Sequence, residues 1–470
     1  MIPVIAAKEI LEIRRDGRFR IAAIVFWLLS ISAFAAGVAH YAALTREAQT
    51  ASQDERARWL DQGRKYPHAA AHYGVFAFKS PRPLSVFDSG IEPYLGSSIW
   101  LEAHKQNESL YRPAEDATSL QRFGDLTLAR LAQELAPLLI IILGYAAFAG
   151  ERETGTLRQL MSIGVPGRKL LLGKAAGLAS GLAALCLPAV LLVLVAAAVL
   201  SEPPAAADEL LRAALLILAY GAYLGGFIFL TLAVSAWCRS ARAALVILLA
   251  FWALSVLAVP RFVAGEAAAI GPAGLTIDRR IALETALKEA GARLEEKQKA
   301  ELFEKYNVTK IEDLPFDYWG VALQTDEEGK YAIFEKHYAQ LFDALARELA
   351  LYQLGTLLSP LTGLQIVSMT LAGSDTSQHR DFVLQAEAYR RVIHTVINDY
   401  ILKHAARNDE GQWKVEAGRE LWETIPPFQY KSPGVAGALP HCALGLALLG
   451  LWLALCFAAA WRAAGRLNPL

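Results

Sequence analysis

The sequence predicts an all-α polytopic membrane protein, with six transmembrane helices, an N-terminal amphipathic elbow helix and mainly helical extracytoplasmic insertions. Apolar residues make up 54% of the 470 residues, and the mean hydropathy is +0.30. Both values are too high for a soluble protein of this size. The net charge is zero and the pI is near 7.1, so the composition gives no sign of nucleic-acid binding.

Six apolar segments are long enough to cross a membrane, because a hydrocarbon core about 30 Å thick needs roughly 20 residues of helix. These segments are 20–41, 131–149, 175–200, 211–236, 243–263 and 438–461. A further apolar stretch, 351–372, contains Gly355, Pro360 and Gly363. We therefore expect it to lie on the outer membrane surface as an amphipathic segment and not to span.

The charges of the short connecting loops predict the orientation. Basic residues occur before the first segment, in the second-to-third and fourth-to-fifth loops, and after the last: Lys8, Arg14, Arg15, Arg18, Arg20, Arg152, Arg158, Arg168, Lys169, Lys174, Arg239, Arg242, Arg462 and Arg466. The loop 201–209 carries only the acids Glu202, Asp208 and Glu209. By the positive-inside rule both termini are cytoplasmic, and the insertions 42–130 and 264–437 are extracytoplasmic by parity.

The first 43 residues have a competing interpretation as a cleaved signal peptide. Their apolar stretch is longer than a typical signal core, and five further spans need no cleaved leader, so we favour a retained first span. Residues 1–18 alternate apolar and charged side chains at helical spacing. This pattern predicts a helix in the cytoplasmic interface, which serves either as an anchor or as a functional elbow.

The four cysteines all fall in or beside apolar segments; they are Cys186, Cys238, Cys442 and Cys456. No disulfide framework can therefore hold the two polar insertions together. We expect each insertion to fold on its own apolar content.

The cytoplasmic loop 150–174 combines a short amphipathic helix, a Gly/Pro turn and a basic re-entry into the membrane. Leu157, Leu160 and Met161 share one helical face, flanked by charged residues. A lever that docks into a groove on a cytoplasmic partner needs such an apolar face. On physical grounds alone, an ordinary solvated loop is the more common outcome.

The stretch from Glu151 to Lys174 resembles the coupling-helix signature of type-2 ABC transporter permeases. It has an acidic-basic-acidic start, then Gly-Thr-Leu, a Pro turn, a basic pair and Leu-Leu-Gly-Lys. The order Gly-Val-Pro-Gly departs from the Pro-Val-Ser of many members. The resemblance implies that the following residues contact a separate ATP-hydrolysing subunit: Glu151, Arg152, Glu153, Gly155, Thr156 and Leu157. Leu160, on the same apolar face, completes this candidate site.

The resemblance also implies a multi-pass protein of the plasma membrane, here the bacterial inner membrane, that is not itself an enzyme. The nearest phosphate-loop lookalike, from Gly167 to Lys174, has five intervening residues instead of four and lacks the Ser or Thr that would hold magnesium. We expect no cofactor in this chain, with ATP and magnesium bound by the partner ATPase. One six-span chain is half a transporter, so a homodimer or a heterodimer with a sister permease is implied. Gly177-x-x-x-Gly181 and Gly221-x-x-x-Gly225 would permit close helix contacts, either at that seam or within the chain.

The insertions resemble those of a subgroup of these permeases that carries a large extracytoplasmic domain of unknown function between spans five and six. The matching stretches are 67–74, 101–107, 312–320 and 359–391. Long helical runs are expected near 278–306, 327–353 and 376–406, with Ser374 or Asp375 as the N-cap of the last.

Histidines in the first insertion suggest a metal site. His68 and His72 are four residues apart, which places both rings on one face of a helix, and His104 with Glu102 could complete the coordination. Surface or capping histidines are the plain alternative.

The leading hypothesis is therefore a permease subunit, an exporter or a mechanical transmitter, that couples ATP hydrolysis to an extracytoplasmic task. The alternative is a membrane-anchored extracytoplasmic sensor or metal-handling protein without an ATPase partner. An ion-coupled secondary transporter is disfavoured, because spans one, three, five and six carry no ionisable residue at their centres. The cargo stays open.

Overall fold

The computed structural model describes residues 1–116, 126–201, 205–270 and 277–467. Within these residues, six helices are long and apolar enough to cross a membrane: α2 (Gly17–Leu60), the α6–α8 run (Leu128–Glu153), α10 (Gly167–Val199), α11 (Ala206–Trp237), the α12–α13 run (Ala241–Ile270) and α19 (Val435–Gly465). Five of the predicted apolar segments lie within one of them, and the sixth, 175–200, extends one residue past the end of α10. The predicted fold class, an all-α polytopic membrane protein, is confirmed.

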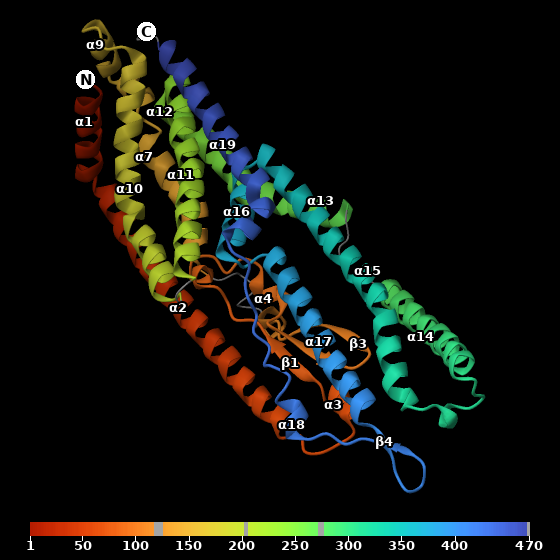
Figure 1. Ribbon diagram of the computed structural model, residues 1–470. Coiled ribbons are helices and arrows are strands. Elements are labelled where there is room, and N and C mark those ends of the chain that lie inside the picture. Colours follow the sequence, from red (N-terminus) through yellow and green to blue (C-terminus); the bar gives the residue numbers. More distant parts are fainter. Residues whose placement is uncertain (117–125, 202–204, 271–276, 468–470) are drawn as a thin grey trace.

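Both chain termini lie at the same end of the helical bundle, and the polar insertions form the opposite end (Figure 1). We call residues 42–116 and 277–434, apart from α16, the distal domain. Helix α2 is one continuous helix of 44 residues and enters this domain. Asp16 begins it by accepting a hydrogen bond from the Arg18 backbone N–H. Of the acidic loop predicted between spans three and four, Glu202 lies outside the described residues.

Two of the six spans are interrupted by wider π-helical turns. The second span consists of α6 (Leu128–Arg130), η3 (Leu131–Leu135), α7 (Ala136–Gly144) and α8 (Ala149–Glu153). The fifth consists of α12 (Ala241–Trp252), η4 (Ala253–Ala258) and α13 (Val259–Ile270). At the same end as the termini lie the N-terminal helix α1 (Ile2–Arg15) and the short helix α9 (Thr156–Ser162).

The distal domain is mainly helical, as predicted. Its longer helices are α14 (Ile277–Tyr306), α15 (Tyr318–Leu354) and α17 (Thr376–His404). Asp375 caps α17 by accepting from the backbone N–H of Gln378. Its short helices are α3 (Pro67–Tyr73), η1 (Pro83–Val86), α4 (Glu92–Leu95), α5 (Pro113–Asp116), η5 (Ile311–Asp313), η6 (Gly355–Leu357) and α18 (Arg419–Trp422).

The distal domain also contains a small antiparallel sheet that the hydrophobic pattern did not reveal. Strands β1 (Val75–Phe78), β2 (Ser98–Glu102) and β3 (Lys105–Leu110) pair in that order. A two-stranded pair, β4 (Ala406–Arg407) and β5 (Trp413–Lys414), lies further along the chain. The three-stranded sheet packs with α2, α15 and α17 around a core of its own, which includes Trp59, Phe334, Phe382 and Trp422.

Helix α16 (Pro360–Ala372) is not on the outer membrane surface, so that expectation was wrong. It packs against α11 and α19, and eleven of its thirteen residues are buried. Its polar side chains are satisfied internally: Ser368 donates to Asp88, and Thr370 donates to Asp375 at 2.7 Å. With these groups paired, the helix can be buried on all sides.

A buried ionic joint connects the distal domain to the spans. Arg82, just before η1, donates to Glu209 at 2.8 Å and to Asp208 at 2.9 Å, both in the first turns of α11. Arg212, which is fully buried, donates to Asp208 at 2.9 Å and to the Pro433 carbonyl at 2.7 Å. The two acids predicted as loop charges are therefore in a helix and paired with arginines.

Candidate functional site

The predicted lever is a helix–turn–helix unit, α8 and α9, at the end of the bundle that carries both termini (Figure 1). Gly155 connects the two helices with φ +79°, a left-handed conformation that glycine adopts without strain. Leu157, in the first turn of α9, is completely buried and joins the core of the spans. The apolar side of α9 is thus packed onto this same chain.

The charged start of the unit is tied to the rest of the protein. Glu151 accepts from Lys174 of α10 at 2.8 Å and from Lys8 of α1 at 3.2 Å. Lys174 is only 2% exposed and also donates to Glu9 of α1 at 2.7 Å. One buried lysine therefore joins α1, α8 and α10.

The next two residues bind the fourth and fifth spans. Arg152 donates to the carbonyls of Cys238 and, at 2.9 Å, Ala236 at the end of α11. These carbonyls have no partner within their helix, and a cation is favourable there. Glu153 accepts from the Ala241 backbone N–H, at the start of α12, at 3.1 Å. A displacement of α8 would consequently be transmitted to α1, α10, α11 and α12.

The outward side of α9 is polar except for one large apolar residue. Arg158, Gln159 and Ser162 are exposed. Ile163, directly after the helix, is 77% exposed. An exposed isoleucine among polar side chains at the tip of a protruding helix is a contact point that fits a hydrophobic groove.

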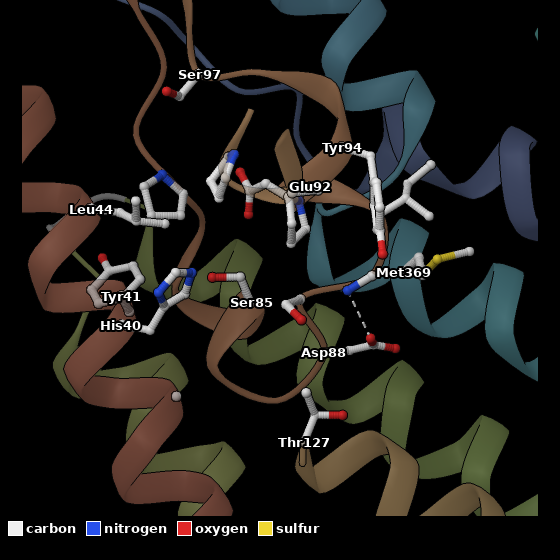
Figure 2. A pocket seen from close by; sticks show the side chains of 18 of the residues that line it. His40, Tyr41, Leu44, Ser85, Asp88, Glu92, Tyr94, Ser97, Thr127 and Met369 are labelled. Carbon is white, nitrogen blue, oxygen red and sulfur yellow. Dashed lines mark hydrogen bonds between the residues drawn. The ribbon is translucent and has the colours of Figure 1, made fainter. Parts of the chain in front are cut away.

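A cavity of about 1530 Å³ lies where the distal domain meets the spans. Figure 2 shows His40, Tyr41 and Leu44 of α2 along one side of it, with Tyr94 and Met369 among the residues across from them. Its lining mixes tyrosines and aliphatic groups with charged residues such as Glu92, Arg112 and Arg130. The volume exceeds that of a typical small-molecule pocket, roughly 300–1,000 Å³, and the mixed lining suits an amphipathic molecule.

Asp88 is a buried carboxylate at the edge of this cavity. Its Oδ1 accepts from the backbone N–H of Gly90 at 3.0 Å (Figure 2), and its Oδ2 accepts from Ser368 of α16. Burial raises the pKa of Asp88 above its usual range, although both hydrogen bonds oppose that change. The polar chain continues through the Tyr220 hydroxyl, 3.0 Å from Ser368, to the Gln133 amide at 2.8 Å.

Three of the four residues predicted to bind a metal come together on the distal domain. Helix α3 begins at Pro67 and ends at Tyr73, followed by Gly74 with φ +66°, so His68 and His72 share one face of two short turns. The ring centroids of His68 and His72 are 4.9 Å apart, and those of His68 and His104 are 5.1 Å apart. Nε2 of His68 lies 3.2 Å from Nε2 of His104.

Glu102 is not among the side chains whose donor atoms cluster with these histidines. It is the last residue of β2, and its carboxylate accepts from the Asn107 amide of β3 at 3.1 Å. His104 instead occupies the turn between the two strands, with φ +65°. The carboxylates that face His104 come from α15: Nδ1 lies 2.8 Å from Glu327 and 3.5 Å from Asp326.

The electrostatic environments of the histidines differ. Hydrogen bonding to Asp326 and Glu327 raises the pKa of His104 to about 9. Burial, together with charge on His104 and His72, lowers the pKa of His68 to about 3. Burial alone would raise the pKa of Glu327, but its contacts with His104 and His394 lower that pKa below the usual range.

The family model described as ABC-2 family transporter protein matches residues 3–306. The chain belongs to the ABC-2 transporter family. A second model, a domain of unknown function (DUF3526), matches residues 277–431 and covers all of α14 to α17. A comparison with curated proteins finds no match. The suspected resemblance, including its large extra domain, is confirmed.

Membership of the ABC-2 family identifies the chain as a permease-type membrane subunit and gives the α8–α9 unit its context. Of the residues predicted to contact an ATPase, Glu151, Arg152 and Leu157 use their side chains within this chain, while Gly155 and Thr156 form the turn into α9. Leu160 is partly buried against the same core. The exposed residues Arg158, Gln159 and Ile163 were not predicted as contacts. Their position outside the apolar face of α9, which is formed by Leu157, Leu160 and Met161, is the feature of the sequence that could have identified them as exposed.

Proposed function

We propose that this chain is the membrane subunit of an ATP-driven transporter whose ATPase is a separate polypeptide that docks on the outward side of α9. The observation that supports this most directly is the α8–α9 unit of an ABC-2 family member. Its tip exposes Ile163, while its base is bonded to the N-terminal helix and three spans. A displacement of α9 by a bound partner would be transmitted through α8 to the N-terminal helix and these three spans.

The proposed orientation places this unit, and both termini, in the cytoplasm of a bacterial cell. The basic short loops at that end support it through the positive-inside rule. The distal domain is then extracytoplasmic. It performs the work that ATP hydrolysis drives, and the transporter acts as an exporter or a mechanical transmitter. We propose that the chain works as half of a dimer, with a second copy or a sister permease.

The test is co-purification of the tagged full-length chain from its native membrane, with ATP hydrolysis as the readout. We expect an ATP-hydrolysing subunit to accompany the wild-type chain. Ile163→Asp should weaken that association about 10- to 100-fold, because burying an isoleucine contributes about 1.5–3 kcal/mol.

Ile281→Asp is the matched control, since Ile281 is 56% exposed on α14 of the distal domain. It should leave the association unchanged. If no ATP-hydrolysing chain accompanies the wild-type protein, or if both substitutions weaken the association equally, the proposal is wrong.

A further inference from the structure

The three imidazoles of His68, His72 and His104 form a compact triangle on the distal domain. Their ring centroids are separated by 4.9, 5.1 and 5.2 Å, and one nitrogen from each ring lies within 4.8 Å of the others. Two of the rings come from α3 and the third from the β2–β3 turn. This convergence is produced by the fold, because 32 to 36 residues separate His104 from the other two in sequence.

We propose that these three histidines bind one divalent transition-metal ion of the Zn²⁺ class, with a fourth coordination position open to solvent or to a ligand. Two nitrogens bound to Zn²⁺ at 2.0–2.1 Å in a tetrahedral arrangement lie about 3.3–3.4 Å apart. The Nε2 atoms of His68 and His104 are 3.2 Å apart, so this pair is already at the spacing that the ion needs. Three imidazoles and no thiolate favour zinc, copper or nickel over magnesium or calcium.

The surroundings of His104 fit a metal ligand that has a carboxylate next to the ring nitrogen facing away from the metal. Its Nδ1 faces Glu327 at 2.8 Å, and its backbone N–H donates to the same Oε1 at 2.8 Å. A carboxylate on this side of the ring favours a proton on Nδ1 and leaves Nε2 to the metal. Glu327 is itself held by Arg390 at 3.1 Å and His394 at 3.0 Å through its other oxygen. It is therefore a positioning residue and not a ligand.

The site would connect two parts of the molecule that the family comparison separates. The three histidines lie in the ABC-2 segment and Glu327 lies in the DUF3526 segment. A bound ion would lock α3 to the β2–β3 turn, and through His104 to α15 and α17. His72 is exposed, and three-ligand sites keep an open position, so the ion should exchange with solvent and be removable by a chelator.

The test uses the purified full-length chain carrying an affinity tag without histidines. The protein is stripped with a chelator, incubated with Zn²⁺, desalted and measured by mass spectrometry of the metal. We expect one zinc per chain in the wild type and a loss of at least tenfold in affinity for His72→Ala and His68→Ala. His72 is exposed, so its variant keeps the result interpretable if the His68 variant folds poorly.

Three further variants test whether zinc binding is specific to these histidines. His404→Ala removes an exposed histidine from the end of α17 and should bind zinc as the wild type does, and Glu102→Gln should also leave binding intact. Glu327→Gln should weaken binding about 10- to 100-fold, as loss of a supporting carboxylate does. Co²⁺ in the wild type should give the intense visible absorption of a tetrahedral complex.

The same zinc content in the wild type and in both histidine variants would overturn the proposal, and so would a wild-type chain that holds no zinc. Neither measurement involves the ATPase. Failure of the metal site and failure of the proposed transport function are therefore distinguishable.

Discussion

Lys174 is the residue on which the base of the α8–α9 unit depends. It is 2% exposed, and both of its carboxylate partners, Glu9 and Glu151, are themselves largely buried, with side chains 11% and 13% exposed. A buried ion pair is a weak source of net stability, but removing one partner leaves an uncompensated charge. Here the ammonium group of Lys174 is the buried cation for both carboxylates, whereas Lys8, which also contacts them, is 47% exposed.

Lys174→Met should therefore lower the free energy of unfolding by about 3 kcal/mol. The methionine fills similar space but leaves Glu9 and Glu151 with only the half-exposed Lys8 as a nearby cation. Thermal unfolding of the detergent-solubilised chain, followed by tryptophan fluorescence, measures the change.

Lys169→Met is the matched control, because Lys169 is exposed on the same helix, and it should change stability little. Adding Glu9→Gln to Lys174→Met should restore part of the loss, since the two sites interact directly. Equal stability of the two single variants would show that the buried cluster does not support the unit.

The histidine site shows how far residue-level sequence reasoning reaches. The spacing of His68 and His72 in a seven-residue helix bounded by Pro67 and Gly74 was visible in the sequence, and the structure brings both to His104. The partner carboxylate was not visible. Glu327 is 223 residues from His104, and no local pattern connects a strand turn to the middle of a distant helix, so the nearer Glu102 was chosen instead.

At the scale of elements, the glycines of α10 receive the N-terminal helix. A Cβ atom built on Gly177 would lie 2.3 Å from Cβ of Glu9, and one on Gly173 would lie 2.5 Å from Ile5. Gly181 faces Ile13 in the same way, at 3.2 Å. The Gly177-x-x-x-Gly181 spacing left two alternatives open, a dimer seam and close helix packing within the chain. Packing of α1 against α10 within the chain accounts for these glycines.

Gly177→Ala should destabilise the chain, whereas Gly221→Ala should be neutral or stabilising. Both substitutions gain about 1 kcal/mol in helix propensity, but only the first forces α1 away from α10; a Cβ on Gly221 meets no atom within 4 Å. Unfolding midpoints of the two variants in detergent, measured side by side, give the comparison. A Gly177→Ala chain at least as stable as Gly221→Ala would show that α1 does not depend on this contact.

At the element scale, the position of helix α16 is a feature that the hydrophobic pattern did not predict correctly. Gly355, Pro360 and Gly363 in the stretch 351–372 correctly argued against a seventh span. Pattern alone does not distinguish a helix on a membrane surface from one enclosed by protein, because both are apolar and interrupted. Long-range contacts place α16 inside the protein. Ser368 donates a hydrogen bond to Asp88, which is 280 residues away in sequence, and Ser359 donates one to the Ser255 carbonyl of the fifth span.

On the scale of the whole molecule, hydropathy and loop charge predicted six spans and placed the two polar insertions together at one end. The structure adds the connections between those parts. The joint around Arg82 and Asp208 connects the distal domain to α11, while α2 runs without a break from the spans into the distal domain, a length of about 66 Å at 1.5 Å per residue. The joint does not follow from the sequence, because it depends on which distant segments meet.

These connections lead to a prediction for the cavity. One wall is α2 and another includes α16, which packs on α11. The α8–α9 unit is bonded to α10 and α11 at the opposite end of the bundle. If the ATPase moves that unit, the walls of the cavity should shift relative to each other, and ATP should change which of two arrangements is populated.

Ser97, in the cavity wall (Figure 2), provides the reporter. In a chain with Cys186 and Cys238 replaced by serine, Ser97→Cys should react with a membrane-impermeant maleimide at a rate that changes several-fold when ATP and the ATPase subunit are added. Asp409→Cys, on the exposed loop between β4 and β5, should react at the same rate in both conditions. An unchanged rate at position 97, with the ATPase bound and hydrolysing, would mean that the movement of α9 does not reach the cavity, and the output would then have to be sought elsewhere in the distal domain.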